Sequence, residues 1–434
     1  MSTPNPEPTP GSGSSAVNND PSTTPEVATQ SASQKRTKLT GSSRTAILGA
    51  MFLMATSSIG PGFITQTSVF TVQLGVAFAF AILVSLLVDI AIQLNVWRVL
   101  GVTGLRANEL GNRVLPGIGW VMAAFVFVGG LIFNIGNIGG AGLGINAMLG
   151  VDARIGGAVS ALIAIVVFVF KSAGAALDRI VVALGAIMIL LMLYVAIVSE
   201  PPIGAALKNT VLPEQVDFLV ITTLIGGTVG GYITFAGAHR LIDSKITGAE
   251  NVGHITGVSV MSVIVTGIMR VLLFLAILGV VAGGVALSND NTAADAFRAA
   301  AGEIGLRFFG VVLWAAGLTS VIGASYTSIS FVTTQKTSTR VRSLLTVGFI
   351  LVCAIAYLVL NKAPQTLLIF AGAFNGLILP IGFAVVMWVA WARRDLLHGY
   401  AYPKWLAVVG TLTWLLTIWL GWKSLTGIAA LWQG

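Results

Sequence analysis

Long apolar stretches separated by short polar ones run through the chain after about residue 40. Windows of about 20 apolar residues, the length that crosses a bilayer as a helix, predict eleven membrane-spanning segments. These are Ala46–Leu74, Val76–Trp97, Ile118–Leu149, Ile155–Phe170, Leu177–Val198, Phe218–Ala238, Val252–Val281, Leu306–Phe331, Leu344–Leu360, Thr366–Trp391 and Trp405–Trp422. The pattern therefore predicts an all-α integral membrane protein with a single transmembrane domain over residues 41–434.

The first 40 residues have a different composition. They are rich in Ser, Thr, Pro and Asn and almost free of large apolar side chains, so they offer too little apolar surface to fold. The apolar core of a signal peptide is missing before Leu39. We therefore expect residues 1–40 to form a disordered tail, which the charge pattern described below places in the cytoplasm.

Glycine-rich breaks interrupt two of the predicted spans. The first span contains Gly60-Pro61-Gly62, and the sixth contains Gly226-Gly227-Thr228-Val229-Gly230-Gly231. Proline lacks a backbone donor and glycine makes the chain pliable, while a backbone group left unpaired in lipid is costly. A simple proline kink would explain the first break alone. Interrupted helices in corresponding positions of two halves are instead typical of secondary transporters that bind their substrate at the breaks.

The two breaks divide the first ten spans into two halves of five. Each half begins with a broken helix, and because five is odd, the second half must be inverted relative to the first. The eleventh span is then an addition to a 5+5 inverted repeat. This arrangement predicts that the two broken helices meet inside the membrane.

Composition and charge support a membrane protein. Hydrophobic residues make up 56% of the chain and charged residues 9%, whereas a soluble domain has about 25% charged residues. Most of the 24 Lys and Arg residues fall in alternate loops, which predicts a cytoplasmic N-terminus and an external C-terminus. The net charge of +8 therefore reflects membrane orientation rather than nucleic-acid binding. We expect a multi-pass protein of the plasma (inner) membrane whose partners are the lipid bilayer and a small transported solute.

Five segments resemble a known family. They are Ile59–Phe63, Ala141–Gly150, Gly226–Tyr232, Ala316–Tyr326 and Asn375–Pro380. In this order they resemble the natural-resistance-associated macrophage protein (Nramp) family of divalent-metal transporters, over nearly the whole chain after the tail. The resemblance implies a LeuT-like fold with broken helices 1 and 6, no cofactor, and proton-linked uptake of a Mn- or Fe-type cation.

The family's metal-binding positions carry other residues in this chain. By the resemblance, the first-helix Asp and Asn fall on Gly60 and Phe63, and the sixth-helix Met and His fall on Gly230 and Tyr232. A divalent cation is usually held by at least one carboxylate or by soft sulfur ligands. The sequence therefore indicates a divergent subgroup without the usual metal ligands.

The residues at the breaks favour a different solute. The unpaired N–H groups of half-helix N-termini carry partial positive charge, and glycine lets a carboxylate approach them closely. The alternative to metal uptake is thus symport of a small carboxylate-bearing solute, such as an amino acid or oxo-acid. A third interpretation is that the glycines only permit close helix packing. The candidate substrate-binding residues are Ser57, Gly60, Phe63, Thr65, Gly227, Thr228, Gly230, Tyr232 and Asn375.

Few ionisable residues lie within the predicted spans, and intramembrane ionisable groups are usually paired or functional. Asn134 and Asn137, which fall on the family's acidic pair of the third helix, are expected to face the central cavity. Asp89 and Arg270 have either a coupling or a structural role. His239 is a candidate for proton linkage or part of a cytoplasmic cap. The sequence contains no nucleophile–base set of the kind that would indicate an enzyme. A further alternative is a membrane sensor that transports nothing, and a flux assay would distinguish it from a transporter.

Overall fold

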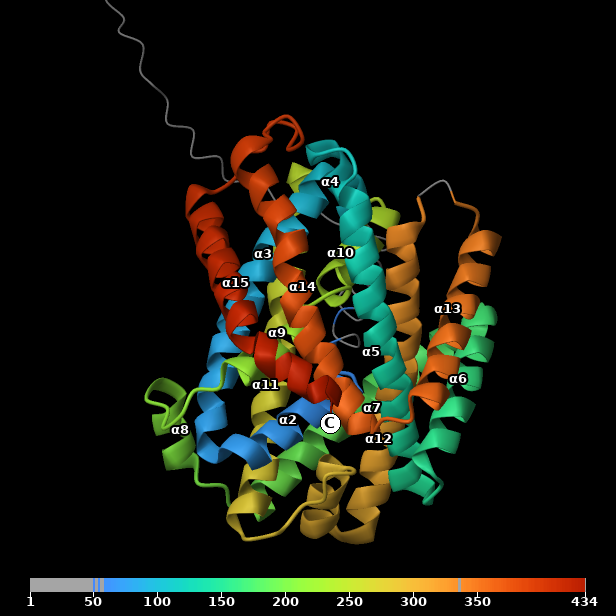
Figure 1. Cartoon of the computed structure of the whole chain (residues 1–434), viewed down its shortest axis with the longest axis vertical. Helices are drawn as coiled ribbons and strands as arrows, with labels where there is room; N and C mark the ends of the chain where they lie inside the picture. The colour runs from blue at the N-terminus through green and yellow to red at the C-terminus, as the bar shows by residue number, and fades with distance from the viewer. Residues whose placement is uncertain (1–49, 51–53, 55–57, 335–336, 434) are drawn as a thin grey trace, which may run out of the picture. The chain divides into compact units, whose positions relative to one another are not determined.

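The computed structural model describes residues 50, 54, 58–334 and 337–433, which fold as a bundle of helices (Figure 1). The predicted tail, Ser57 and most of the first half of the first span lie outside the described residues. The helices are α2 (Pro61–Leu74), η1 (Gly75–Ala77), α3 (Phe78–Thr103), α4 (Ala107–Val114), α5 (Ile118–Leu149), α6 (Ala153–Val169), α7 (Lys171–Val198), α8 (Ile203–Val211), α9 (Phe218–Val229), α10 (Ile233–Asp243), η2 (Ala249–Asn251), α11 (Val252–Ala282), α12 (Thr292–Val332), α13 (Thr339–Leu360), α14 (Pro364–Ala392) and α15 (Lys404–Gln433). The predicted spans correspond to α2, α3, α5, α6, α7, α9 with α10, α11, α12, α13, α14 and α15.

Length and composition alone give fewer spans than the eleven predicted. Eight helices of the described residues qualify, or nine if the bent pair Leu184–Val198 and Ile203–Val211 is one span. In this count Pro61–Thr103 is one element of 43 residues, which would be about 65 Å long at the rise of an α-helix, roughly twice the hydrocarbon thickness. Gly75, with a φ of 53°, and η1 interrupt it, so we divide it into α2 and α3. α6, with 17 residues, is just shorter than a typical span.

Both predicted breaks are present in the described residues. α2 begins at Pro61, whose fixed φ suits the first helical turn, and Gly60 before it is extended (φ −94°, ψ −173°). Between α9 and α10, Gly230 is extended and Gly231 has a φ of 53°, in the left-handed region that favours glycine. The backbone therefore leaves the helical path at both positions.

Helices in corresponding positions of the two halves pack against each other. α2 contacts α9, α3 contacts α11, and α5 and α12 form the most extensive helix pair of the described residues. Two inverted copies of one motif produce this pairing. α15 packs on the outside against α14, α9 and α3, as expected for a helix added to the repeat (Figure 1).

The apolar pattern missed two short helices and part of a long one. α4 and α8 lie in segments between predicted spans, and α4 starts where the Glu109 carboxylate accepts a hydrogen bond from the Arg106 backbone N–H at 3.1 Å. α12 begins at Thr292, well before the predicted Leu306, because the chain remains helical on both sides of a non-helical residue, Gly302 (φ 63°). These parts are polar or short, so a search for about 20 apolar residues passes over them.

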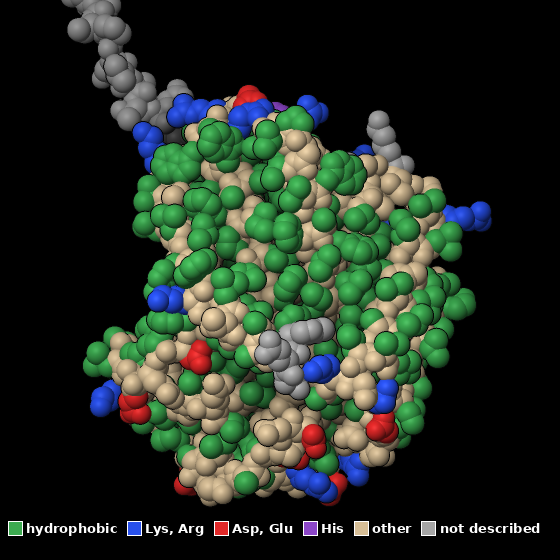
Figure 2. Space-filling model, in the orientation of Figure 1, with side chains coloured by type: hydrophobic (Ala, Val, Ile, Leu, Met, Phe, Trp, Pro, Cys, Tyr) green, Lys and Arg blue, Asp and Glu red, His purple; other side chains and the backbone are tan. Residues whose placement is uncertain are grey.

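A broad apolar band covers the visible surface. Figure 2 shows hydrophobic side chains over most of the middle of this face and charged side chains mainly towards its two ends. Large apolar side chains are more than half exposed on many of the helices; examples are Leu162, Leu190, Ile355 and Leu412. An apolar band of this kind suits contact with lipid tails rather than water.

Candidate functional site

One hydrogen bond ties the two breaks together. Ser58, just before the first break, donates from its Oγ to the backbone carbonyl oxygen of Thr228 at 3.0 Å. Thr228 lies in the last turn of α9, and its own hydroxyl donates to the Leu224 carbonyl oxygen at 2.8 Å. Ser58, Thr228 and Leu224 are all buried. The two half-helices therefore meet in a region closed to solvent.

The first turn of α2 presents backbone donors at the first break. Gly60 provides no side-chain cap, and the hydrogen bond from the Ile64 N–H to the Gly60 carbonyl oxygen (3.3 Å) is the first of the helix. The N–H groups of Gly62 and Phe63 precede it, so they have no acceptor within the helix. These donors and the helix dipole create partial positive charge at the break.

A buried arginine lies against this turn. The guanidinium carbon of Arg270, on α11, is 4.5 Å from the centroid of the Phe63 ring, and its Nη1 donates to Thr228 Oγ1 at 3.0 Å. Arg270 is 3% exposed, yet its Nε and Nη2 have no hydrogen-bond partner. Arg270 thus touches a residue from each broken helix and retains two unused donors.

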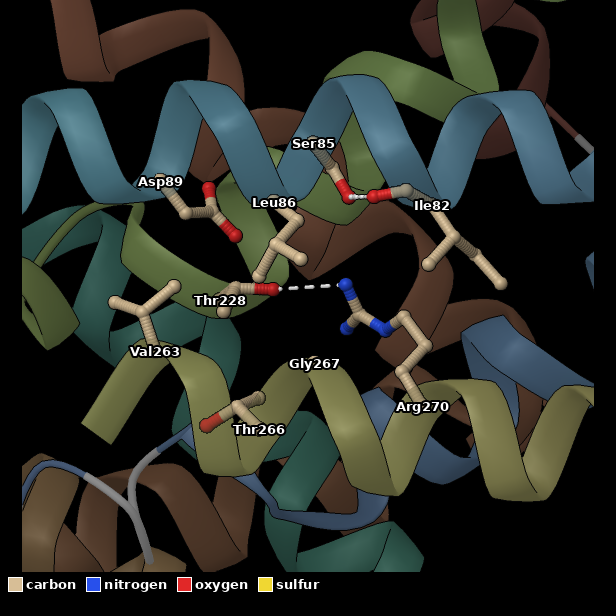
Figure 3. A pocket seen from close by; sticks show the side chains of 9 residues that line it. All are labelled: Ile82, Ser85, Leu86, Asp89, Thr228, Val263, Thr266, Gly267 and Arg270. Atoms are coloured by element: carbon tan, nitrogen blue, oxygen red, sulfur yellow. Dashed lines mark hydrogen bonds between the residues drawn. The ribbon is translucent and has the colours of Figure 1, made fainter. Parts of the chain in front are cut away.

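Asp89 shares a small cavity with Arg270 (Figure 3). The cavity has a volume of about 10 Å³, which is room for a single water molecule. In Figure 3 the Thr228 hydroxyl lies between the Asp89 carboxylate and the Arg270 guanidinium, and Asp89 Oδ1 has no hydrogen-bond partner. The remaining lining residues are Ile82, Ser85, Leu86, Val263, Thr266 and Gly267. The two charges therefore face each other across a cavity beside the second break, a pairing that sequence reasoning had left open.

Glycines at the breaks make space for polar side chains of neighbouring helices. A Cβ on Gly60 would lie 2.5 Å from Ser320 Oγ, and one on Gly227 would overlap the amide of Gln66. Gln66 Nε2 donates to the Leu368 carbonyl oxygen at 3.2 Å, while its Oε1 is buried without a partner. Sequence reasoning did not select Gln66 or Ser320 as site residues. The sequence did contain a sign that Gln66 belongs to the site, because it places a polar amide in an apolar span one turn after the first break.

Tyr232 and Asn137 are buried polar residues beside the breaks. The Tyr232 ring packs edge-on against Phe133, with 5.7 Å between ring centroids, and its hydroxyl has no hydrogen-bond partner. Asn137 Oδ1 is 3.6 Å from the position of a Cβ on Gly60, and both polar atoms of its amide lack a partner. These unpaired groups are suited to hydrogen bonding with a bound solute or water.

The other predicted polar residues are held more firmly. Asn375 Nδ2 donates to the Gly129 carbonyl oxygen at 3.1 Å, and Asn134 Nδ2 donates to Ser325 Oγ at 3.0 Å. Thr65 is buried in α2. Asn375 and Asn134 thus also link neighbouring helices, although the side-chain carbonyl oxygen of each has no hydrogen-bond partner.

His239 lies apart from this group and links three helices. Its Nε2 is 3.1 Å from the backbone N–H nitrogen of Ala107 in α4, and its Nδ1 is 2.9 Å from Ser330 Oγ in α12. The imidazole also packs against Phe331, with 4.8 Å between ring centroids. His239 is fully buried, so both of its nitrogens depend on these contacts.

The side chains at the breaks do not fit a metal centre of the usual kind. Among the described residues, no group of three or more His, Cys, Asp or Glu side chains lies together. Ser58 and Thr228 offer only neutral hydroxyl oxygens, and that of Thr228 already accepts a hydrogen bond from Arg270. Asp89 brings a carboxylate to the second break, where Arg270 already faces it. Divalent cations are normally bound by several oxygen ligands that include at least one carboxylate.

Sequence comparison identifies relatives over most of the chain. Residues 51–426 match the family described as natural resistance-associated macrophage protein-like. The uncharacterized membrane protein YcsG of Bacillus subtilis is 46% identical over 390 residues, which cover 89% of this chain and 96% of that protein. An uncharacterized membrane protein of Haemophilus influenzae is 48% identical over 368 residues, covering 85% of this chain and 92% of that protein.

Two solved structures of different proteins share the fold. A mutant of the manganese transporter of Eremococcus coleocola matches with a TM-score of 0.70 and 16% identity, covering 92% of this chain and 90% of that one. MhsT in complex with L-phenylalanine matches with a TM-score of 0.62 and 16% identity, covering 86% of this chain and 98% of that one. These matches confirm the predicted multi-span LeuT-like helical fold.

Proposed function

The chain belongs to the Nramp-like family of membrane transporters, and from that premise we propose that it is a secondary transporter of a small carboxylate-bearing organic solute. An amino acid or an oxo-acid is the expected class, carried by symport. The solute would bind between the broken helices α2 and α9–α10. The chain would then represent a divergent subgroup of its family, without the usual metal ligands.

One observation carries this proposal: the charged side chain that touches both broken helices is a cation. Arg270 contacts Phe63 of α2 and Thr228 of α9, and the positions of the family's metal ligands carry Gly60, Phe63, Gly230 and Tyr232. The uncapped first turn of α2 adds partial positive charge. A site of this charge supports an anionic group.

The charge of Arg270 favours an anion over a dication. Two unit charges about 6 Å apart interact by about 3 kcal/mol at an effective dielectric constant of about 20. A dication near Arg270 would meet roughly twice that repulsion, and a carboxylate would gain a comparable attraction. Asp89 offsets part of both effects, because it faces Arg270 in the same cavity.

Divalent-metal transport is the second candidate. Family membership and the fold shared with a manganese transporter favour it. Backbone carbonyl oxygens at the breaks, with the hydroxyls of Thr65 and Thr228, would then have to bind the cation without a first-helix carboxylate. Such a site would be weak, because neutral oxygens replace the hydration of a dication poorly.

The test is uptake by the purified full chain in proteoliposomes. We expect saturable uptake of at least one ¹⁴C-labelled carboxylate from a panel of L-alanine, L-phenylalanine, L-proline, pyruvate and 2-oxoglutarate, and stimulation by an inward proton gradient. Uptake of ⁵⁴Mn²⁺ should equal that of empty liposomes. Saturable ⁵⁴Mn²⁺ uptake without any carboxylate uptake would overturn the proposal in favour of the metal.

A further inference from the structure

Arg270 has more hydrogen-bonding capacity than its neighbours use. Its Nη1 donates to Thr228 Oγ1, whereas Nε and Nη2 are buried and donate to nothing. A buried guanidinium with unpaired donors costs free energy that a suitable acceptor would recover. Phe63, in the first turn of α2, lies under the guanidinium. The guanidinium therefore packs against the side chain of a residue in the first turn of α2.

The geometry points to Arg270 as the residue that binds the carboxylate of the transported solute, together with the first turn of α2. This inference rests on the proposed function and assigns the recognition of the carboxylate to one side chain. Nε and Nη2 form the edge of a planar fork that matches the two oxygens of a carboxylate. The backbone N–H groups of Gly62 and Phe63 would supply further donors.

Asp89 is the counter-charge of Arg270 when no solute is bound. It faces Arg270 across the cavity of about 10 Å³, with the Thr228 hydroxyl between them, rather than forming a close ion pair. A close pair would occupy the donors that a substrate needs. The separation leaves the guanidinium compensated by charge and yet free to bind, which a purely structural ion pair would not require.

Three variants of the full chain in proteoliposomes test this role. Arg270→Gln combined with Asp89→Asn removes both charges together, so no uncompensated buried charge destabilises the fold. Asp89→Asn alone leaves the cation. Arg307→Gln removes a half-exposed arginine that pairs with Glu303 at the surface and is the control. Each is measured for uptake of the carboxylates of the panel and for thermal stabilisation by the same compounds and by their carboxamides.

We expect the double variant to remain folded and to lose carboxylate uptake, or to raise its KM at least tenfold. Asp89→Asn should retain binding and gain a larger thermal shift with the carboxylate, because the solute then supplies the missing negative charge. The carboxamides should give no shift with any variant. Arg307→Gln should behave as the wild type.

Two results would overturn the assignment in distinguishable ways. Wild-type uptake of a carboxylate with an unchanged KM in the double variant would reject Arg270 as the binding residue and leave the proposed function standing. Absence of carboxylate uptake and of carboxylate thermal shifts in the wild type would reject both. A role of Arg270 in folding alone predicts a lower melting temperature in Asp89→Asn without a larger carboxylate shift, which also rejects the assignment.

Discussion

His239 is held in one neutral form by its two hydrogen bonds. The backbone N–H of Ala107 can only donate, so His239 Nε2 must accept and carries no proton. Ser330 Oγ gives its own proton to the Thr327 carbonyl oxygen at 2.6 Å, so it accepts from Nδ1–H. A second proton on the ring would bring two N–H groups against each other. This geometry favours a structural link over the proton linkage that the sequence left open for His239.

We expect His239→Gln to lower stability without moving the pH dependence of transport. The substitution leaves the Ala107 N–H or Ser330 Oγ buried with poorer partners, at a cost of about 1–3 kcal/mol. The apparent melting temperature in detergent and solute uptake between external pH 5.5 and 7.5 measure the two effects. His398→Asn is a suitable control, because His398 is exposed with a φ of 48° that asparagine tolerates. A displaced pH midpoint at unchanged stability would contradict this assignment.

At the scale of elements, the glycine-rich run at the end of α9 has two separate purposes. Gly231 has a positive φ and allows the chain to turn between α9 and α10. Gly226 is helical, and a Cβ there would overlap the backbone of α14 at Gly372 and Gly376. Close helix packing, which the sequence offered as an alternative to a substrate site, therefore applies to Gly226, whereas the break requires Gly231.

Gly226→Ala should disrupt the contact between α9 and α14. Backbone atoms cannot move aside as a flexible side chain can, so the helices must separate, at a cost of about 1–3 kcal/mol or more. Gly253→Ala is the matched control in α11, where a Cβ would meet nothing within 4 Å and helix propensity improves by up to about 1 kcal/mol. Fluorescence-detected size-exclusion chromatography after heating measures the melting temperature of both variants. Equal melting temperatures for the two variants would show that α14 can adjust.

The helices and their breaks could be predicted from the sequence wherever they depend on neighbouring residues alone. Gly60-Pro61 forces a helix break, and apolar length defines most spans, so both breaks were placed correctly. The start of α12 was missed because Gly302 kinks a helix that continues in polar sequence. The approach of Asp89 to Arg270 depends on the packing of α3 against α11, which no local pattern encodes. The contacts between site residues that are distant in sequence could therefore not be predicted from the sequence.

At the scale of the whole molecule, side chains of α4, α10 and α12 form a polar network, at the end of the bundle where Figure 1 shows α4. Arg106, at the start of α4, lies 2.6 Å from the Asp243 carboxylate at the end of α10, and Tyr326 of α12 donates to the same carboxylate at 2.8 Å. The side chain of Arg106 is 1% exposed. Sequence predicts this end to be cytoplasmic, from its Lys and Arg residues. Arg342 of α13 also lies 3.8 Å from the Asp243 carboxylate, so side chains of α4, α12 and α13 converge on the end of α10.

Asp243→Asn should therefore open this end towards the breaks. Arg106 would lose its charged partner and keep only its hydrogen bonds to the backbone carbonyl oxygens of Ser330 and Thr333, which weakens the closed arrangement by about 1–3 kcal/mol. Ser328 follows Tyr326 of this network by two residues in α12: it is buried, and its Oγ overlaps the position of a Cβ on Gly130, which would also lie 3.7 Å from the Tyr232 ring. In a Cys353→Ser background, which removes the single native thiol, Ser328→Cys provides a probe whose alkylation by N-ethylmaleimide reports exposure.

The alkylation rate of this probe should rise at least fivefold when Asp243→Asn is added. Asp395→Asn is the control, because Asp395 pairs with Arg393 in an exposed loop after α14 and links no other helix. If the solute binds at the breaks, saturating solute should slow alkylation in the opened protein, since the probe lies beside Tyr232 through Gly130. A rate unchanged by Asp243→Asn would mean that the helices stay closed through apolar packing alone. The alternating access expected of an inverted repeat would then be controlled elsewhere.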